Sequence, residues 1–213
     1  ISTCLESLGV DRVIVFDLHA GQIQGFFSSI TPVDNLYVES YFIKYINKHI
    51  LNTCHPLTES FSINDLVIVS PDEGGVKRAV RISQKLKCSA ATIYKDRAKP
   101  NEINKMVLMG EVSGKIAILV DDMVDTAGTL TMAADLVIDR GAKSVRAICT
   151  HAILSGDAFN KIEKSKLEEL IVSDSITSKK NHPKVKILSC SKLFAEVMES
   201  VHSNKSIHSK FLM

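Results

Sequence analysis

The sequence lacks the features that mark several large classes of protein. No apolar run approaches the length of a membrane span, and Ile1 does not open a signal peptide. The five cysteines are scattered and odd in number, without the spacing of metal ligands, so we expect reduced thiols in a cytoplasmic protein. The net charge is only +2, and no basic stripe carries interleaved aromatic residues. We therefore expect neither a nucleic acid nor a membrane as partner.

The composition fits a globular α/β protein. Of the 213 residues, 45% are hydrophobic and 23% are charged, which suits one large domain or two small ones. Strand-like and helix-like segments alternate, and this order predicts a mostly parallel sheet flanked by helices. The expected strands are Arg12–Asp17, Leu66–Ser70, Ala90–Tyr94, Ile116–Asp121, Ser144–Thr150, Glu169–Ser173 and Val185–Ser189. The expected helices are Ile1–Leu8, Val38–Ile50, Gly75–Leu86, Thr129–Arg140 and Ser191–His202, with mobile loops over Leu51–Asn64 and Lys95–Met106.

The segment from Lys115 to Ala142 carries the strongest chemical pattern. An apolar run ends in the neighbouring carboxylates Asp121 and Asp122, and a loop of small and hydroxyl residues leads into an amphipathic helix. Ligands of parallel sheets bind where strands end, and a helix N-terminus attracts anions. Paired carboxylates can accept hydrogen bonds from two sugar hydroxyls while such a loop cradles a phosphate, which is what a ribose 5-phosphate requires. The loop residues are Asp125, Thr126, Ala127, Gly128 and Thr129.

Three further segments place charged residues after expected strands. Asp17 and His19 leave one sheet edge on the same side, where such a pair can hold a divalent cation. Asp72 lies in a turn whose two glycines let backbone N–H groups approach a ligand. Lys95 and Arg97 begin a polar segment, and phosphoryl transfer needs positive charge of this kind. Each pattern also has an ordinary reading: a structural histidine, a common β–α turn and a solvated loop.

These motifs resemble those of known families. The string Asp121-Asp122-x-x-Asp125, with Thr126–Thr129, resembles the phosphoribosyl-diphosphate loop of type I phosphoribosyltransferases and of ribose-phosphate diphosphokinases. The string DLHAGQIQGFF, completed by Pro32-Val33-Asp34, resembles a signature of the diphosphokinases that phosphoribosyltransferases do not carry. Further stretches similar to that family are Ser70-Pro71-Asp72-x-Gly74-Gly75, Lys95-x-Arg97 and Thr150–Gly156.

The resemblance implies an activity and a role for each matching residue. The reaction would move the diphosphoryl group of ATP to the C1 hydroxyl of ribose 5-phosphate, with Mg²⁺ as cofactor, giving phosphoribosyl diphosphate and AMP for nucleotide biosynthesis. Lys95, Arg97 and His19 would be catalytic; Arg97, Asp121, Asp122, Asp125, Thr126, Ala127, Gly128 and Thr129 would bind ribose 5-phosphate; His19, Asp72, Asp17 and Asp34 would be metal ligands; and Ser70, Asp72, Gly74 and Gly75 would form the diphosphate loop.

The match is incomplete at one place. Four residues, Ser28 to Thr31, stand where the family has two, and none of them is a carboxylate. The metal role that the family gives to an Asp at this position is therefore not carried over. This insertion is the one feature that favours a non-catalytic, synthetase-associated regulatory subunit over an enzyme. A type I phosphoribosyltransferase is a third alternative, which the DLHAGQIQGFF string disfavours.

The resemblance also implies how the chain is organised. Residues 1–34 would be the end of a truncated N-terminal α/β domain, residues 35–204 a type I phosphoribosyltransferase-like domain, and residues 205–213 a tail that packs on the first domain. We thus interpret the chain as the C-terminal two-thirds of a diphosphokinase. We expect a homo-oligomer in which dimers assemble to a hexamer. By itself the chain should keep the ribose 5-phosphate half-site but turn over poorly.

Overall fold

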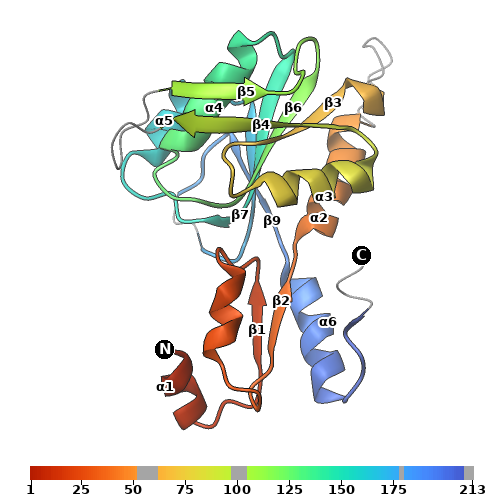
Figure 1. Cartoon of the computed structure of the whole chain (residues 1–213), viewed down its shortest axis with the longest axis vertical. Coiled ribbons are helices and arrows are strands. Elements are labelled where there is room, and N and C mark those ends of the chain that lie inside the picture. Colours follow the sequence, from red (N-terminus) through yellow and green to blue (C-terminus); the bar gives the residue numbers. More distant parts are fainter. Residues whose placement is uncertain (52–61, 97–104, 178–179, 209–213) are drawn as a thin grey trace. The chain divides into compact units, whose positions relative to one another are not determined.

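The computed structural model describes residues 1–51, 62–96, 105–177 and 180–208 (Figure 1). The chain divides into two compact units. Unit 1 comprises Ile1–Ser40 and Cys190–Met213, and unit 2 comprises Tyr41–Ser189. None of the described helices is long and apolar enough to cross a membrane.

Unit 2 is built on a seven-stranded sheet with the order β5-β4-β3-β6-β7-β8-β9. All neighbouring strands are parallel except β4 and β5. The mostly parallel α/β architecture predicted from the sequence is therefore confirmed. The strands are β3 (Leu66–Ser70), β4 (Ser89–Asp96), β5 (Lys105–Met109), β6 (Ile116–Val124), β7 (Ser144–Ala152), β8 (Glu169–Ser173) and β9 (Val185–Leu188).

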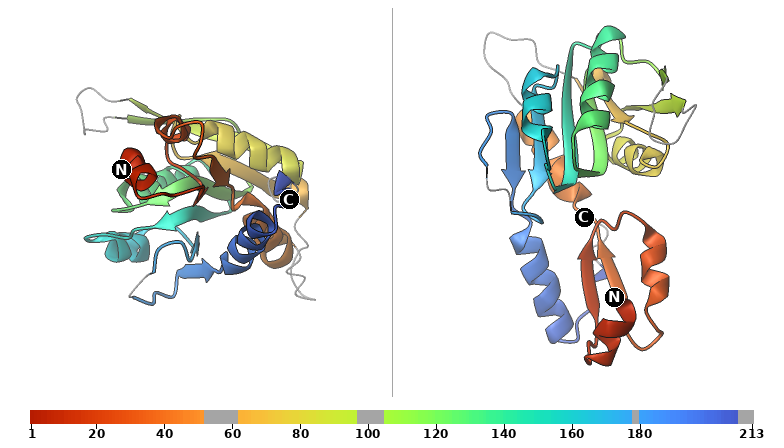
Figure 2. Two further views of the ribbon diagram at one scale, coloured as in Figure 1. Left: turned by 90° about the horizontal axis from the view of Figure 1, so that it is seen from below. Right: turned by 90° about the vertical axis from the view of Figure 1, so that its left-hand side faces the viewer.

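Helices cover this sheet (Figure 2). They are α2 (Glu39–Ile46), α3 (Val76–Leu86), α4 (Gly128–Asp139) and α5 (Ala158–Lys164), with a short 3-10 helix over Ile63–Asp65. Alternate strand residues such as Val67 and Leu119 join one buried cluster with side chains of α4 and α5. Their neighbours Ile68 and Ile118 are also fully buried. Both faces of the central strands are thus covered, as continuous apolar runs predict for a parallel sheet.

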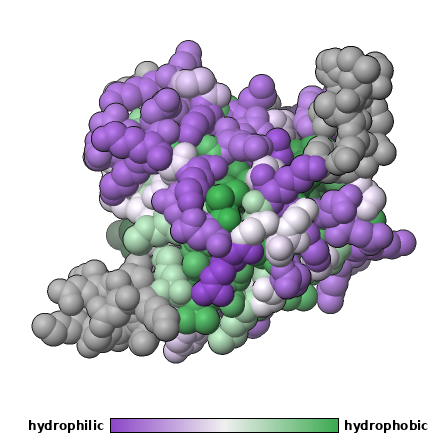
Figure 3. Space-filling view, turned by 90° about the horizontal axis from the view of Figure 1, so that it is seen from above, coloured by the Kyte–Doolittle hydropathy of each residue, from purple (hydrophilic) through white to green (hydrophobic). Residues whose placement is uncertain are grey.

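The predicted apolar face of the helix after β6 is confirmed. Leu130, Ala133, Ala134 and Val137 of α4 are all buried. Their spacing of three and four residues places them on one side of the helix. Figure 3 shows the molecule from above, where much of the visible surface is hydrophilic with smaller apolar areas between.

Unit 1 pairs two short parallel strands with helices. Its elements are α1 (Ser2–Ser7), β1 (Val13–Phe16), a 3-10 helix η1 (Gly21–Phe26), β2 (Val33–Leu36) and α6 (Ser191–His202). Phe194 of α6 meets Phe16 of β1 edge to face, with 4.8 Å between ring centroids. This contact helps explain why α6 groups with unit 1, although the sequence predicts a domain of residues 35–204 that includes it. The division into domains itself stays a prediction.

Several element boundaries differ from the predictions. The helix expected over Val38–Ile50 begins at Glu39, and Asn47–Leu51 forms a π-helix. The strand expected to end at Asp121 continues to Val124 because its ladder with β7 runs on to Ala152. The loop expected over Lys95–Met106 is shorter at both ends, since β4 and β5 pair there as antiparallel strands. Short β2, β5 and α5 were not predicted.

Candidate active site

Three neighbouring strands bring the candidate residues of unit 2 together. The sheet order β4-β3-β6 places Lys95, Asp72 and Asp121 at or beyond the carboxyl ends of adjacent strands. Asp72 and Asp121 line one cavity of about 200 Å³ together with the connection from β6 to α4. The sequence-based expectation that a ligand site forms at this edge is consistent with that geometry.

The connection from β6 to α4, Asp125 to Thr129, forms one wall of this cavity. Ala127 has a φ of 59°, a left-handed conformation that is strained for a residue with a Cβ. Helix α4 begins at Gly128, one residue before the predicted start. The Thr131 hydroxyl donates to the carbonyl oxygens of Ala127 (2.9 Å) and Gly128 (3.1 Å). The first N–H groups of α4 have no partner within the helix, so the wall can receive an anion.

Two neighbouring carboxylates, Asp121 and Asp122, lie near the end of β6. The Asp122 backbone N–H donates to Asp121 Oδ1 at 2.9 Å. Burial, then the neighbouring carboxylates of Asp122 and Asp72, raise the pKa of Asp121 to about 7. Desolvation and like charges both disfavour the ionised carboxylate. The pair is therefore ready to accept hydroxyl donors or a cation, either of which would relieve this repulsion.

The turn after β3 fixes the position of Asp72. Gly75 N–H donates to Asp72 Oδ1 (3.2 Å), and Ser70 Oγ donates to the Asp72 carbonyl (2.6 Å). A Cβ on Gly75 would lie 2.6 Å from Ser70 Oγ and 3.5 Å from the Val120 carbonyl, so only glycine fits this packing. Gly74 is exposed, and a Cβ there would lie 3.4 Å from Asp72 Oδ1.

Lys95 completes the described part of this site. Its Nζ lies 2.9 Å from Asp72 Oδ2, and only 4% of its side chain is exposed. An ammonium group held in such a position needs its carboxylate partner, because burial of an unpaired charge is costly. Arg97, the second basic residue of the predicted motif, lies outside the described residues.

The candidate metal ligands of unit 1 lie among structural contacts. Asp17 is fully buried, and its Oδ2 accepts from the Val38 N–H at 3.5 Å. Asp34 forms an ion pair with Arg12, while His19 is exposed. Within the ranges that the structure describes, no three His, Cys, Asp or Glu side chains form a metal cluster. Asp17, His19 and Asp34 belong to unit 1 and Asp72 belongs to unit 2.

Two residues beside the site were not predicted from the sequence. Ser155 Oγ donates to Asp125 Oδ1, and Lys161 Nζ of α5 donates to the Thr126 carbonyl at 3.1 Å. Ser155 stands in the stretch Thr150–Gly156 noted above, but that stretch gave it no role. The buried residues Ala158 and Ile162, four apart, are the signal that could have revealed α5.

Comparison with known proteins places the chain in a family. A model described as the phosphoribosyl synthetase-associated domain matches residues 95–212. Ribose-phosphate pyrophosphokinase A of Dictyostelium discoideum is 44% identical over 99% of this chain and 63% of its own length. The ribose-phosphate pyrophosphokinase of Fusobacterium nucleatum is 43% identical over 99% of this chain and 64% of its own.

A solved structure agrees with these matches. The phosphoribosylpyrophosphate synthetase of Mycobacterium smegmatis superimposes with a TM-score of 0.82 at 34% identity, covering 95% of this chain and 62% of that one. The chain thus spans less than two thirds of the length of these relatives. Because the domain model matches more than half of the chain, and because the resemblance seen in its motifs extends over almost all of it, the chain belongs to the phosphoribosyl synthetase (ribose-phosphate pyrophosphokinase) family.

Proposed function

We propose that this protein is a ribose-phosphate diphosphokinase. It would transfer the diphosphoryl group of ATP to the C1 hydroxyl of ribose 5-phosphate, releasing AMP and supplying phosphoribosyl diphosphate for nucleotide biosynthesis. The observation that carries the proposal is the arrangement around one cavity: Asp72, Asp121 and the β6–α4 connection line it, and Lys95 is paired to Asp72. Such a site offers an anion-binding wall, hydroxyl acceptors and a positive group together.

Ribose 5-phosphate would occupy the side of the cavity formed by β6 and α4. The 5-phosphate would bind Thr126–Thr129 at the start of α4, where free N–H groups and the helix dipole favour an anion. Asp121 and Asp122 would accept hydrogen bonds from the ribose hydroxyls. The raised pKa of Asp121, caused by burial and neighbouring carboxylates, supports this role, since hydroxyl donors offset that cost.

The diphosphate of ATP would occupy the side formed by the turn after β3. The turn from Ser70 to Gly75 would lie beside the transferred group, and the close packing of Gly75 against Ser70 would hold the turn in place. Lys95 and Arg97 would stabilise the charge that develops on this group. The roles of all these residues are part of the proposal.

The donor set suits Mg²⁺, the cofactor that we infer. Carboxylate oxygens are the protein ligands that Mg²⁺ prefers, and Asp72 offers such oxygens beside Asp121. When bound, Mg²⁺ would neutralise charge on the ATP phosphates. His19 is a further candidate ligand. Asp17 and Asp34 are weaker candidates, because Asp17 bonds to the backbone at Val38 and Asp34 is paired with Arg12.

Assembly and location belong to the same proposal. We infer a cytoplasmic homo-oligomer, in which dimers assemble to a hexamer, from the motifs shared with this family. Analytical ultracentrifugation of the purified protein tests the assembly, because a monomer at micromolar concentration would contradict it.

The test of the reaction is an assay of AMP release from ATP, Mg²⁺ and ribose 5-phosphate with the purified full-length parent protein, since the chain by itself is expected to turn over poorly. Turnover should be lost in Lys95→Ala and retained in Lys186→Ala, a matched change at an exposed lysine of the distant edge strand β9. Binding of ribose 5-phosphate without turnover would instead favour a non-catalytic regulatory subunit. Failure to bind ribose 5-phosphate would overturn the proposal.

A further inference from the structure

We propose that Lys161 is a positioning residue that holds the β6–α4 connection in its binding conformation. The proposal rests on the proposed function, because it takes this connection, Asp125 to Thr129, as the binding site of the 5-phosphate. It goes further by assigning the shape of that wall to a side chain of α5, which does not line the cavity among the described residues.

The β6–α4 connection needs external support. Ala127 is held at a φ of 59° and is only 3% exposed. A residue with a Cβ keeps this conformation only where the surroundings determine it. From inside α4, the Thr131 hydroxyl bonds to the carbonyl groups of Ala127 and Gly128. The carbonyl of Thr126, which precedes the strained residue, takes its hydrogen bond from elsewhere.

That hydrogen bond comes from Lys161. Its Nζ donates to the Thr126 carbonyl at 3.1 Å and lies 3.8 Å from the point where a Cβ on Gly128 would stand. The turn before α5 adds two more bonds, because Ser155 donates from Oγ to Asp125 Oδ1 and from its N–H to the Asp125 carbonyl (3.1 Å). The segment from β7 to α5 therefore braces the two residues that precede Ala127.

The direction of the Thr126 carbonyl determines the direction of the next N–H group, that of Ala127. In a trans peptide the C=O and the next N–H point in opposite directions. All peptide bonds among the described residues are trans. With its carbonyl held towards Lys161, this peptide directs the Ala127 N–H away from Lys161. Thr126 and Ala127 line the cavity, so the hydrogen bond from Lys161 sets the direction of the Ala127 N–H as a donor for an anion there.

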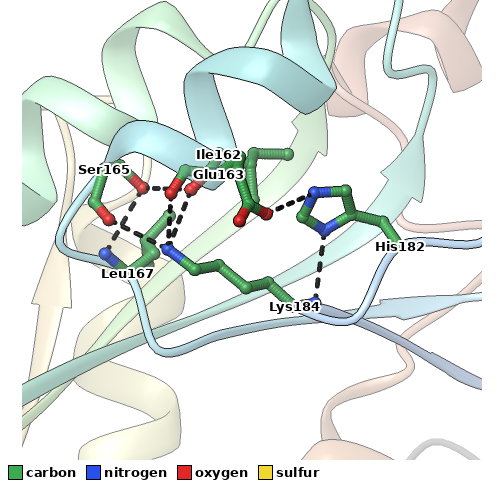
Figure 4. Close-up of polar contacts among 6 residues, drawn as sticks. All are labelled: Ile162, Glu163, Ser165, Leu167, His182 and Lys184. Carbon is green, nitrogen blue, oxygen red and sulfur yellow. Dashed lines mark hydrogen bonds and ion pairs between the residues drawn. The ribbon is translucent and has the colours of Figure 1, made fainter.

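Helix α5 is itself fixed, so that Lys161 has a firm base. Two of its own residues, Ala158 and Ile162, are fully buried. At its end, Lys184 Nζ donates to the carbonyl groups of Ile162 (3.2 Å), Glu163 (2.9 Å) and Ser165 (3.0 Å), as Figure 4 shows. The same view shows His182 Nε2 beside Glu163 Oε2, 2.8 Å away. The C-terminal end of α5 is therefore fixed, and this gives the Lys161 side chain a fixed backbone.

The test compares two lysines of α5 in the purified full-length parent protein. Lys161→Met removes the ammonium group, Lys161→Arg keeps a charged donor, and Lys164→Met removes an exposed charge that makes no hydrogen bond to the connection among the described residues. Ribose 5-phosphate affinity is measured by calorimetric titration. The KM values for ribose 5-phosphate and ATP are then measured in the AMP assay, and a thermal melt confirms that each variant is folded.

Lys161→Met should weaken ribose 5-phosphate binding about tenfold, which is the typical effect of losing one hydrogen bond from a charged donor. The KM for ATP should change less than twofold, and Lys161→Arg should recover most of the affinity. A purely structural role for Lys161 would affect both substrates alike.

Two results would overturn the proposal, and they are distinguishable. If the unmodified protein binds ribose 5-phosphate but Lys161→Met binds it as well as Lys164→Met does, the positioning role of Lys161 is wrong and the proposed function stands. If the unmodified protein does not bind ribose 5-phosphate, the proposed function fails and the positioning role of Lys161 fails with it.

Discussion

The ion pair of Lys95 and Asp72 leads to a prediction in which binding and turnover change in opposite directions. Lys95 Nζ lies 2.9 Å from Asp72 Oδ2, an oxygen that the proposed function gives to a cation. A cation must displace the ammonium group before it can use this oxygen. Lys95→Met removes that competitor, so the cation should bind more tightly although catalysis is lost.

The magnitude follows from the exposure of the two partners. The Asp72 side chain is 33% exposed, so solvent screens the pair in part and its energy is less than that of a fully buried one. A hydrogen bond to a charged group contributes ~1.5 kcal/mol in net terms. Removing the need to break it should lower the dissociation constant of the cation about tenfold.

The assay uses Mn²⁺ as a paramagnetic probe of the Mg²⁺ site. The free Mn²⁺ signal is followed by electron paramagnetic resonance in the unmodified protein, in Lys95→Met and in the control Lys186→Met. Asp72→Asn identifies the site, because binding that depends on this carboxylate must weaken in that variant. Unchanged or weaker Mn²⁺ binding in Lys95→Met, at a site shown to need Asp72, would refute the competition.

Three further predictions concern stability, each measured by chemical denaturation of the purified protein. Since the pKa of Asp121 is about 7 when folded against 3.8 ordinarily, the native state holds more protons between these values, and the free energy of unfolding should fall by a few kcal/mol as the pH rises from about 4 to about 7 without Mg²⁺. Asp121→Asn should reduce this pH dependence, and an equal pH dependence in both proteins would show that Asp121 does not cause it. Gly75→Ala should cost ~1–3 kcal/mol because its Cβ would stand 2.6 Å from Ser70 Oγ. Adding Ser70→Ala should recover part of that loss; no recovery would show that the clash is not with the hydroxyl. Lys184→Met should cost ~1–2 kcal/mol by releasing three carbonyl groups at the end of α5, whereas the exposed Lys186→Met should cost little. Equal losses in these two variants would contradict a stabilising role for the hydrogen bonds from Lys184.

The fold was predictable where the apolar pattern was long. The segments Leu66–Ser70 and Ile116–Val120 are continuous apolar runs or nearly so, and both became strands buried on their two faces. The short strand β5 was missed because its first two residues, Lys105 and Met106, fell at the end of the expected charged loop, and pairing with β4 reveals it. Helix α5 is seven residues long, too short for a clear helical period. Tertiary contacts, not local sequence, determine these elements.

The site was predictable in its residues but not in its contacts. Sheet order follows from the βαβ connections, so residues after β3 and β6 were expected at one edge, and Asp72 and Asp121 do line one cavity. The pairing of Lys95 with Asp72 was not foreseen, because the sequence placed Lys95 in a mobile loop while the structure keeps it in strand β4. The support from Lys161 was missed with the helix that carries it.

The charges around the cavity suggest how the ligands of the proposed function would influence one another. Burial and the nearby carboxylates of Asp122 and Asp72 raise the pKa of Asp121 to about 7, and Lys95 forms an ion pair with Asp72. An anionic phosphate can approach the start of α4 while these carboxylates repel it from the other side of the same cavity. A divalent cation at Asp72 would reduce that repulsion and free Lys95 together. Under the proposed function, the electrostatics would therefore couple cation binding to phosphate binding within one cavity.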